Sequence, residues 1–129
     1  MDFLKSLRQV MVALTAGAFL YAGCGSKNEQ SLTDCLIEKN VRLYSAWWCM
    51  PCLQQEQTLE KELGEKWSYF KENIVVQCYE ESKISLVQQC EDKKIEFFPA
   101  WEFPDRNPNR EYGVQSLEKI AELAGCEHR

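Results

Sequence analysis

The fold is decided by residues 41–52, VRLYSAWWCMPC, in which a strand-like segment runs directly into two closely spaced cysteines. Residues 41–46 alternate in polarity and are rich in strand-forming types, so we expect a strand that ends near Trp47. Pro51 suits the first turn of a helix, because the N–H that proline lacks has no helical partner there. The pattern therefore predicts a strand, a short turn that carries Cys49 and Cys52, and a helix.

The spacing of Cys49 and Cys52 is typical of dithiol chemistry. Two cysteines in a first helical turn can bring their sulfurs together, and the free N–H groups and partial positive charge of the helix N-terminus stabilise a thiolate on the first. Cys49 would attack a partner disulfide, and Cys52 would resolve the mixed disulfide. The same spacing forms half of a four-cysteine zinc site, to which Cys78 and Cys90 could add ligands, so a zinc-stapled binding module stays open as an alternative.

Residues 1–23 have the layout of a secretory signal peptide. Basic residues precede an apolar run over 10–22, which at about 1.5 Å per residue reaches roughly 20 Å, short of the roughly 30 Å of a bilayer core. The segment LYAGC, which ends at Cys24, resembles a bacterial lipobox, and the polar residues 24–30 suit a flexible tether. We expect an extracytoplasmic, membrane-anchored lipoprotein acylated at Cys24, with a soluble secreted protein as the alternative.

Composition narrows the function classes. The sequence has 129 residues and a net charge of -5, with 20 Asp and Glu against 15 Lys and Arg, so no basic face is available and nucleic-acid binding is excluded as a leading function. The sequence holds 7 cysteines, and export would let disulfides form and persist. We expect residues 31–129 to fold as one domain.

The rest of the chain alternates between helix and strand signals. The helix after Pro51 should bury an apolar stripe at Leu53, Leu59, Leu63 and Trp67. We expect further strands at residues 73–79, 97–103 and 110–112, and further helices at 31–39, from a cap at Ser82 or Ser85 to Lys94, and from Ser116 to Gly125. The order βαβαββα predicts an α/β fold with a central mixed sheet flanked by helices.

Two motifs and this element order resemble the thioredoxin superfamily over nearly all of residues 31–129. The motifs are WCMPC at 48–52 and FPA at 98–100. The resemblance implies a thioredoxin-like fold and a thiol:disulfide oxidoreductase that needs no metal or other cofactor.

A narrower resemblance involves LYSAWWC at 43–49, the cysteines at 78 and 90, and GVQSLEKIAELAGC at 113–126. These segments are similar to the thioredoxin-like domain fused to, or partnering, bacterial vitamin K epoxide reductase homologues. That similarity implies electron exchange between exported proteins with thiols or disulfides and a quinone-linked membrane reductase.

The resemblance also implies roles for particular residues. Cys49 is the attacking thiol, Cys52 the resolving thiol, Pro99 a cis-proline that faces them, and Cys78 with Cys90 a structural disulfide. The residues expected to contact a partner protein are Trp48, Met50, Pro51, Phe98 and Pro99. Two rivals remain: a dedicated thiol reductant, as in cytochrome c maturation, and a non-catalytic binding module stapled by disulfides or zinc.

Several residues outside the dithiol carry further expectations. Cys35 lies just before the first predicted strand and Cys126 just after the last predicted helix, so a bridge between them would pin both ends of the fold, although the sequence leaves the connectivity of six cysteines open. The pair at 78 and 90 could instead relay electrons. Leu43 stands where cytosolic thioredoxins keep a buried acid, which leaves Glu56 as a candidate for proton transfer, against an ordinary solvated side chain.

Aromatic residues are expected in the core, because large aromatics dominate burial in small domains. One of Trp47 and Trp48 should be buried, since neighbouring residues of a strand face opposite sides of a sheet. The other core aromatics are expected to be Trp67, Phe97, Phe98, Trp101 and Phe103.

Overall fold

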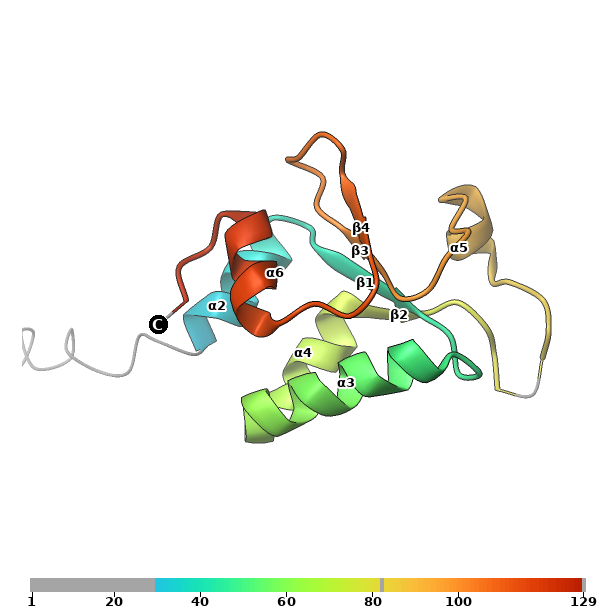
Figure 1. The fold of residues 1–129 in the computed structure, drawn as a ribbon, viewed down its shortest axis with the longest axis horizontal. Coiled ribbons are helices and arrows are strands. Elements are labelled where there is room, and N and C mark those ends of the chain that lie inside the picture. Colours follow the sequence, from blue (N-terminus) through green and yellow to red (C-terminus); the bar gives the residue numbers. More distant parts are fainter. Residues whose placement is uncertain (1–29, 82, 129) are drawn as a thin grey trace, which may run out of the picture.

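An α/β fold with a four-stranded mixed sheet is seen in the computed structural model, which describes residues 30–81 and 83–128 (Figure 1). The strands lie in the order β2-β1-β3-β4, with β2 parallel to β1 and the other two pairs antiparallel. Their bounds are Arg42–Ser45 for β1, Val75–Gln77 for β2, Ala100–Glu102 for β3 and Arg110–Tyr112 for β4.

Helices precede, connect and follow the strands. They are α2 (Gln30–Glu38), α3 (Met50–Leu63), α4 (Trp67–Ile74), α5 (Gln88–Asp92) and α6 (Leu117–Ala124), with a 3-10 turn at Gly64–Lys66. Within the described residues, none of these helices is long and apolar enough to cross a bilayer. The predicted signal peptide and the acylated cysteine, Cys24, lie outside the described residues.

The two faces of the sheet have different coverings. Leu43 and Trp101 are partners across β1 and β3 and belong to the main core, whereas their neighbours Tyr44 and Ala100 belong to a second cluster. This alternation follows from the pleat, which points successive side chains to opposite faces. Helices α2, α3, α4 and α6 supply the main core, while α5 contributes Cys90 to the second cluster. Figure 1 shows α3 and α4 side by side, with α5 set apart from them.

Local signals explain the ends of the last helix. The Ser116 hydroxyl accepts a hydrogen bond from the Lys119 N–H at 3.1 Å, which satisfies one of the free donors of the first turn of α6. Gly125 ends the helix in the left-handed conformation, with φ of 69°, which glycine adopts without a Cβ clash. The predicted helix from Ser116 to Gly125 and the predicted strand at 110–112 are confirmed.

Other predicted boundaries are wrong. The strand expected at 73–79 is only Val75–Gln77, because α4 runs on to Ile74 and buries Phe70 and Ile74, which are one turn apart. The strand expected at 97–103 is Ala100–Glu102, and α5 begins after Val87 rather than after a serine cap. Each of these elements is therefore shorter than its local signal predicts.

Several burial predictions are also wrong. Trp47 and Trp48 are 45% and 49% exposed, because β1 ends at Ser45 and the strand alternation does not extend to them. Phe97 is 64% exposed, since it precedes β3 and packs edge-on against Tyr112 at the surface. Of the other aromatic residues expected in the core, Trp101 and Phe103 are buried, whereas Trp67 and Phe98 are only partly buried.

Two disulfides join parts of the fold that are distant in sequence. One links Cys35 of α2 to Cys126 after α6, with 91 residues of separation and a Cα–Cα distance of 6.1 Å. The other links Cys78, just after β2, to Cys90 of α5, with a Cα–Cα distance of 5.6 Å. Loops of such lengths lose conformational freedom in the unfolded chain when they are closed, so each bond stabilises the fold by about 2–5 kcal/mol.

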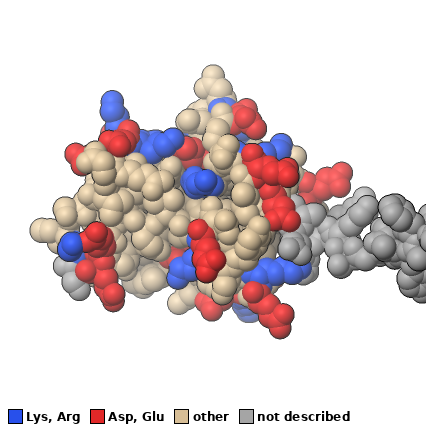
Figure 2. Space-filling view, turned by 180° about the vertical axis from the view of Figure 1, so that it is seen from behind, with Lys and Arg blue, Asp and Glu red and all other residues tan. Residues whose placement is uncertain are grey.

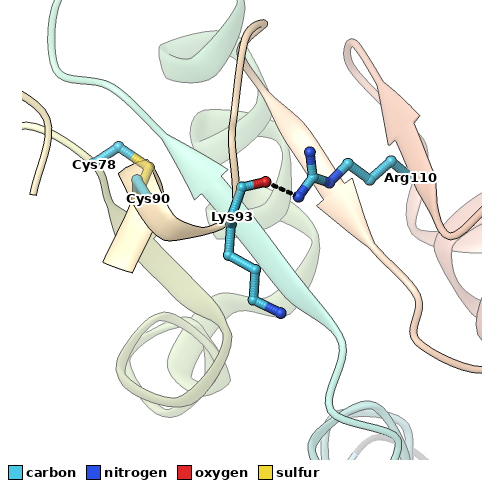
Figure 3. The surroundings of a disulfide bond; sticks show 4 residues. All are labelled: Cys78, Cys90, Lys93 and Arg110. Carbon is cyan, nitrogen blue, oxygen red and sulfur yellow. Dashed lines mark hydrogen bonds between the residues drawn. A yellow bond between two sulfur atoms is a disulfide. The ribbon is translucent and has the colours of Figure 1, made fainter. Parts of the chain in front are cut away.

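A hydrogen bond and two ion pairs also hold the segment around the second disulfide. Figure 3 shows the Cys78–Cys90 bond beside Lys93, whose main-chain carbonyl accepts a hydrogen bond from the Arg110 guanidinium of β4. The buried carboxylate of Glu102 lies 3.0 Å from the Lys93 ammonium and 3.8 Å from the Arg110 guanidinium. The face of the sheet that carries Tyr44 and Ala100 is therefore covered by a short helix, a disulfide and an ion network around the buried Glu102.

The outer surface carries charges of both signs. On the face seen in Figure 2, acidic and basic side chains are interspersed, with uncharged surface between them. Interspersed charges partly cancel one another beyond about 10 Å at moderate salt. This face of the described residues therefore presents no continuous field of one sign.

Candidate active site

The two free cysteines of the described residues lie at the start of α3. Cys49 is the N-cap residue, in an extended backbone conformation, and its Sγ accepts a hydrogen bond from the Cys52 N–H at 3.3 Å. Pro51 occupies the first turn, as the sequence predicted. The sulfur of Cys49 thus takes the place of a capping oxygen, where the helix dipole and a free N–H favour negative charge.

The two cysteines differ in access. Cys49 is 6% exposed, whereas Cys52, one turn further into the helix, is 0% exposed. Burial, and then the hydrogen bond with Cys49, raise the pKa of Cys52 to about 12, while the Ala46 backbone and the Ser45 hydroxyl pull in the opposite direction. Cys49 is therefore the sulfur that an outside disulfide can reach, and Cys52 is held as a neutral thiol.

An aromatic cluster lies against the dithiol. Trp48 makes edge-on contacts with Tyr79 at 5.4 Å and with Phe98 at 5.9 Å between ring centroids, and Tyr79 and Phe98 are 6.0 Å apart. Tyr79 and Phe98 also pack on Cys49 and Cys52. Segments that are distant in the sequence thus form one apolar wall beside the sulfurs.

The other predicted contact residues are divided between surface and interior. Met50 and Pro51 are exposed on the first turn of α3. Pro99 is buried; the Phe98–Pro99 peptide bond is cis, and the Pro99 carbonyl accepts a hydrogen bond from the Gly113 N–H at 2.9 Å. The structure therefore brings Trp48 and Phe98 to the dithiol and leaves Met50 open to a partner.

A buried glutamine that the sequence analysis did not single out fixes the active-site helix. Gln55 is fully buried; its side-chain oxygen accepts hydrogen bonds from the Trp101 indole at 3.2 Å and the Gln115 N–H at 2.6 Å, and its amide donates to the Gln115 carbonyl at 2.9 Å. Leu53, assigned to the buried stripe, is instead partly exposed. The spacing of Cys52, Gln55 and Leu59 marks the true inner face of α3.

An open groove runs along the outer side of α3. It has a volume of about 700 Å³. Its lining includes Trp47, Glu56, Glu60, Trp67, Lys71, Gln77 and Glu80. Glu56, the predicted candidate for proton transfer, lies between this groove and the buried Ser45, whose hydroxyl donates to the carboxylate at 3.1 Å. The carboxylate is therefore neither fully solvated nor remote from the dithiol.

The zinc alternative has less support from the geometry. Cys78 and Cys90, the proposed additional ligands, are bonded to each other rather than to a site with Cys49 and Cys52. Across residues 30–81 and 83–128, no group of three or more His, Cys, Asp or Glu side chains is arranged to hold a metal ion.

Comparison with known proteins finds a distant relative. The chain is 28% identical over 88 residues to thiol-disulfide oxidoreductase LTO1 of Arabidopsis thaliana, an alignment that covers 66% of this chain. It spans 21% of the length of that relative. No family model matches the chain. The resemblance predicted from the motifs is thus confirmed as a distant homology to a thiol:disulfide oxidoreductase.

Proposed function

We propose that this chain is an extracytoplasmic, membrane-tethered thiol:disulfide oxidoreductase with a thioredoxin-like fold, which exchanges disulfides with exported proteins through Cys49 and Cys52. The observation that carries the proposal is the position of Cys49, a free thiol at the N-cap of α3 that accepts the Cys52 N–H at 3.3 Å. The homology to an oxidoreductase supports the same reaction class.

The geometry supports a two-step exchange. The Cys49 thiolate attacks one sulfur of a target disulfide, which breaks the target S–S bond, forms a mixed disulfide and releases the first target thiolate. Cys52, after losing its proton, attacks the Cys49 sulfur and releases the second target thiolate. The protein is oxidised by two electrons and the target is reduced; the reverse sequence of steps donates the disulfide instead.

The surface around Cys49 suits a protein partner. Trp48 and Met50 are exposed at the start of α3, beside Cys49, and Trp48 packs edge-on against Phe98. Exposed apolar side chains beside a reactive sulfur suit contact with a protein partner. Backbone and side-chain contacts there would hold a target disulfide over the Cys49 sulfur.

The fold and the sequence motifs support the remaining parts of the proposal. The mixed sheet with α3 after β1 and α6 after β4 has the element order of the thioredoxin superfamily, and the segments around residues 43–49 and 113–126 resemble the domain that works with vitamin K epoxide reductase homologues. We propose such a quinone-linked membrane reductase as the redox partner. Acylation of Cys24 would keep the domain near it.

The decisive measurement is the reduction potential of the Cys49/Cys52 couple in the purified full chain, by equilibration in glutathione buffers. A value near about -120 to -180 mV marks a disulfide donor, whereas a value near about -270 mV marks a dedicated thiol reductant. The Cys78→Ala/Cys90→Ala variant is the control. If it gives the same reduction potential as the unsubstituted chain, the measured couple is Cys49 and Cys52. A dithiol with no reversible couple contradicts the proposal and favours a binding module.

The membrane tether has its own test. Cells fed a labelled fatty acid should incorporate the label into this chain, and the Cys24→Ala variant should lose both the label and the membrane fraction. An unlabelled chain in the soluble extracytoplasmic fraction would instead support the secreted alternative.

A further inference from the structure

Resolution of the mixed disulfide requires a proton to leave a buried sulfur. Cys52 is 0% exposed and is packed among Ala46, Cys49, Tyr79 and Phe98, so its thiol proton has no direct path to solvent. Only a thiolate is an effective nucleophile toward a disulfide. Some neighbouring group must therefore take the proton of Cys52.

Ser45 is the polar neighbour that connects Cys52 to another group. It is the last residue of β1 and is fully buried, and its hydroxyl, as a donor to the Cys52 thiolate, opposes the rise in the pKa of Cys52. The same hydroxyl donates to the Glu56 Oε2 at 3.1 Å. A hydroxyl can accept one proton while it gives up another, so Ser45 can pass a proton without keeping a charge.

Glu56 is suited to receive that proton. It lies on α3 one turn after Cys52, and its other oxygen, Oε1, accepts a hydrogen bond from the Gln77 amide of β2 at 3.4 Å. Two donors from neighbouring strands thus fix the carboxylate. Glu56 also lines the open groove, which gives the proton a way out to solvent.

We propose, on the basis of the proposed function, that Ser45 and Glu56 form the proton route of the resolving thiol. As Cys52 attacks the Cys49 sulfur, its thiol proton passes to the Ser45 oxygen, and the Ser45 hydroxyl proton passes to the Glu56 carboxylate. The bond between Cys49 and the target breaks, and the target sulfur leaves with the electron pair. When the chain donates its disulfide, the same route returns a proton to Cys52.

Other charged groups face Glu56 from every element around the groove. Glu60 comes from α3, Lys71 from α4, and Glu80 and Glu81 from the segment after β2. They alter the local electrostatic field, but Ser45 and Gln77 are the hydrogen-bond donors found on the Glu56 carboxylate in the described residues. Glu60 is therefore a matched control, because Glu60→Gln removes the same charge from the same helix and groove.

The two steps can be separated with dithiobis(nitrobenzoate), a small aromatic disulfide. One equivalent of coloured thiol is released when Cys49 attacks, and a second when Cys52 resolves the adduct. All variants carry Cys24→Ser, which removes the thiol outside the described residues.

Glu56→Gln should leave the first release unchanged and slow the second by about a hundredfold, the lower range of general-base effects. Ser45→Ala should slow the same step, and Glu56→Asp should restore part of the rate.

The pH profile of the second release distinguishes a proton acceptor from a structural residue. With Glu56 present the rate should reach a plateau, whereas in Glu56→Gln it should rise with hydroxide concentration over the whole range. A second release in Glu56→Gln that matches the chain carrying Cys24→Ser alone, or an equal loss in Glu60→Gln, would overturn the route. If the chain carrying Cys24→Ser alone gives only one equivalent, the proposed dithiol exchange fails instead.

Discussion

Two of the three cysteine pairs of this domain pack against the same aromatic residues and differ in almost every property that controls reactivity. Tyr79 and Phe98 pack both on the Cys49/Cys52 pair and on the Cys78/Cys90 pair. The first pair is free, belongs to a helix N-terminus and includes one residue, Cys49, that is 6% exposed. The second is bonded, spans 12 residues and is fully buried at both ends.

The difference shows that the place of a cysteine pair in the fold, and not the number of cysteines in the chain, decides whether the pair can exchange disulfides or only stabilises the fold. Attack by an outside thiolate needs access to a sulfur, and Cys49 is 6% exposed whereas Cys78 and Cys90, the second of which lies in α5, are both 0% exposed. A relay role for Cys78 and Cys90 would require α5 to open. The following predictions test this comparison.

Loss of Cys49 should have the largest effect. Cys49→Ser removes the only free thiol of the described residues that is even partly exposed, so exchange with a model disulfide should fall by at least about a thousandfold. Stopped-flow measurement of thiol release checks the rate. Cys52→Ser is the control, because it should still form the mixed disulfide and then trap it. Normal exchange by Cys49→Ser would show that the roles are assigned to the wrong sulfur.

Removal of the second pair should affect stability rather than exchange. Cys78→Ala/Cys90→Ala releases a closed loop and should lower the free energy of unfolding by about 3 kcal/mol, measured by urea denaturation. Dithiol exchange should persist in conditions where the variant is folded. If exchange with a membrane reductase fraction is lost while exchange with a small disulfide remains, the pair relays electrons and the comparison drawn above does not hold.

The ion network beside the second pair should contribute less. Glu102→Gln leaves the Lys93 and Arg110 charges without their buried partner, so we expect a loss of about 1–3 kcal/mol in the free energy of unfolding. Glu111→Gln is the matched control on the neighbouring strand. Its ion pair with Arg106, at 3.7 Å, is much more exposed and should cost less than about 1 kcal/mol. Equal losses would argue against a special role for the buried carboxylate.

The last prediction concerns the pH dependence of stability. The pKa of Cys52 is raised in the folded state from 9.0 to about 12, so the folded chain holds this proton more tightly than the unfolded chain does. The resulting stability is fully present below pH 9 and is lost as the pH rises from 9 toward 12. Reduced protein should therefore lose stability more steeply over this window than Cys52→Ala does, as measured by urea denaturation. Parallel slopes would contradict the raised pKa.

The features predictable from sequence are those set by local signals. The dithiol, the proline in the first turn of α3, strand β4 and the capped helix α6 all depend on residues within a few positions of one another. Gly64, a residue type that tolerates the positive φ of 57° found there, likewise ends α3.

The features missed depend on contacts between distant segments. Local periodicity shows neither the burial of Gln55 nor the exposure of both tryptophans before Cys49. The cost of burying the Gln55 amide is offset by hydrogen bonds from Trp101 and Gln115, which are distant in the sequence. The link from Ser45 to Glu56 likewise crosses from β1 to α3. Such polar contacts follow from the tertiary arrangement, which one sequence does not specify by pattern alone.

The bond between Cys35 and Cys126 has a mechanical consequence. It closes the chain into a covalent ring that begins in α2 and ends just after α6, with the whole sheet inside the ring. Tension applied between the segment before α2 and the residues after Cys126 therefore passes through the two sulfur atoms and not through the strands. The domain can be pulled at both ends without unzipping β1 from its neighbours, and the dithiol at α3 stays in a part of the chain that carries no load.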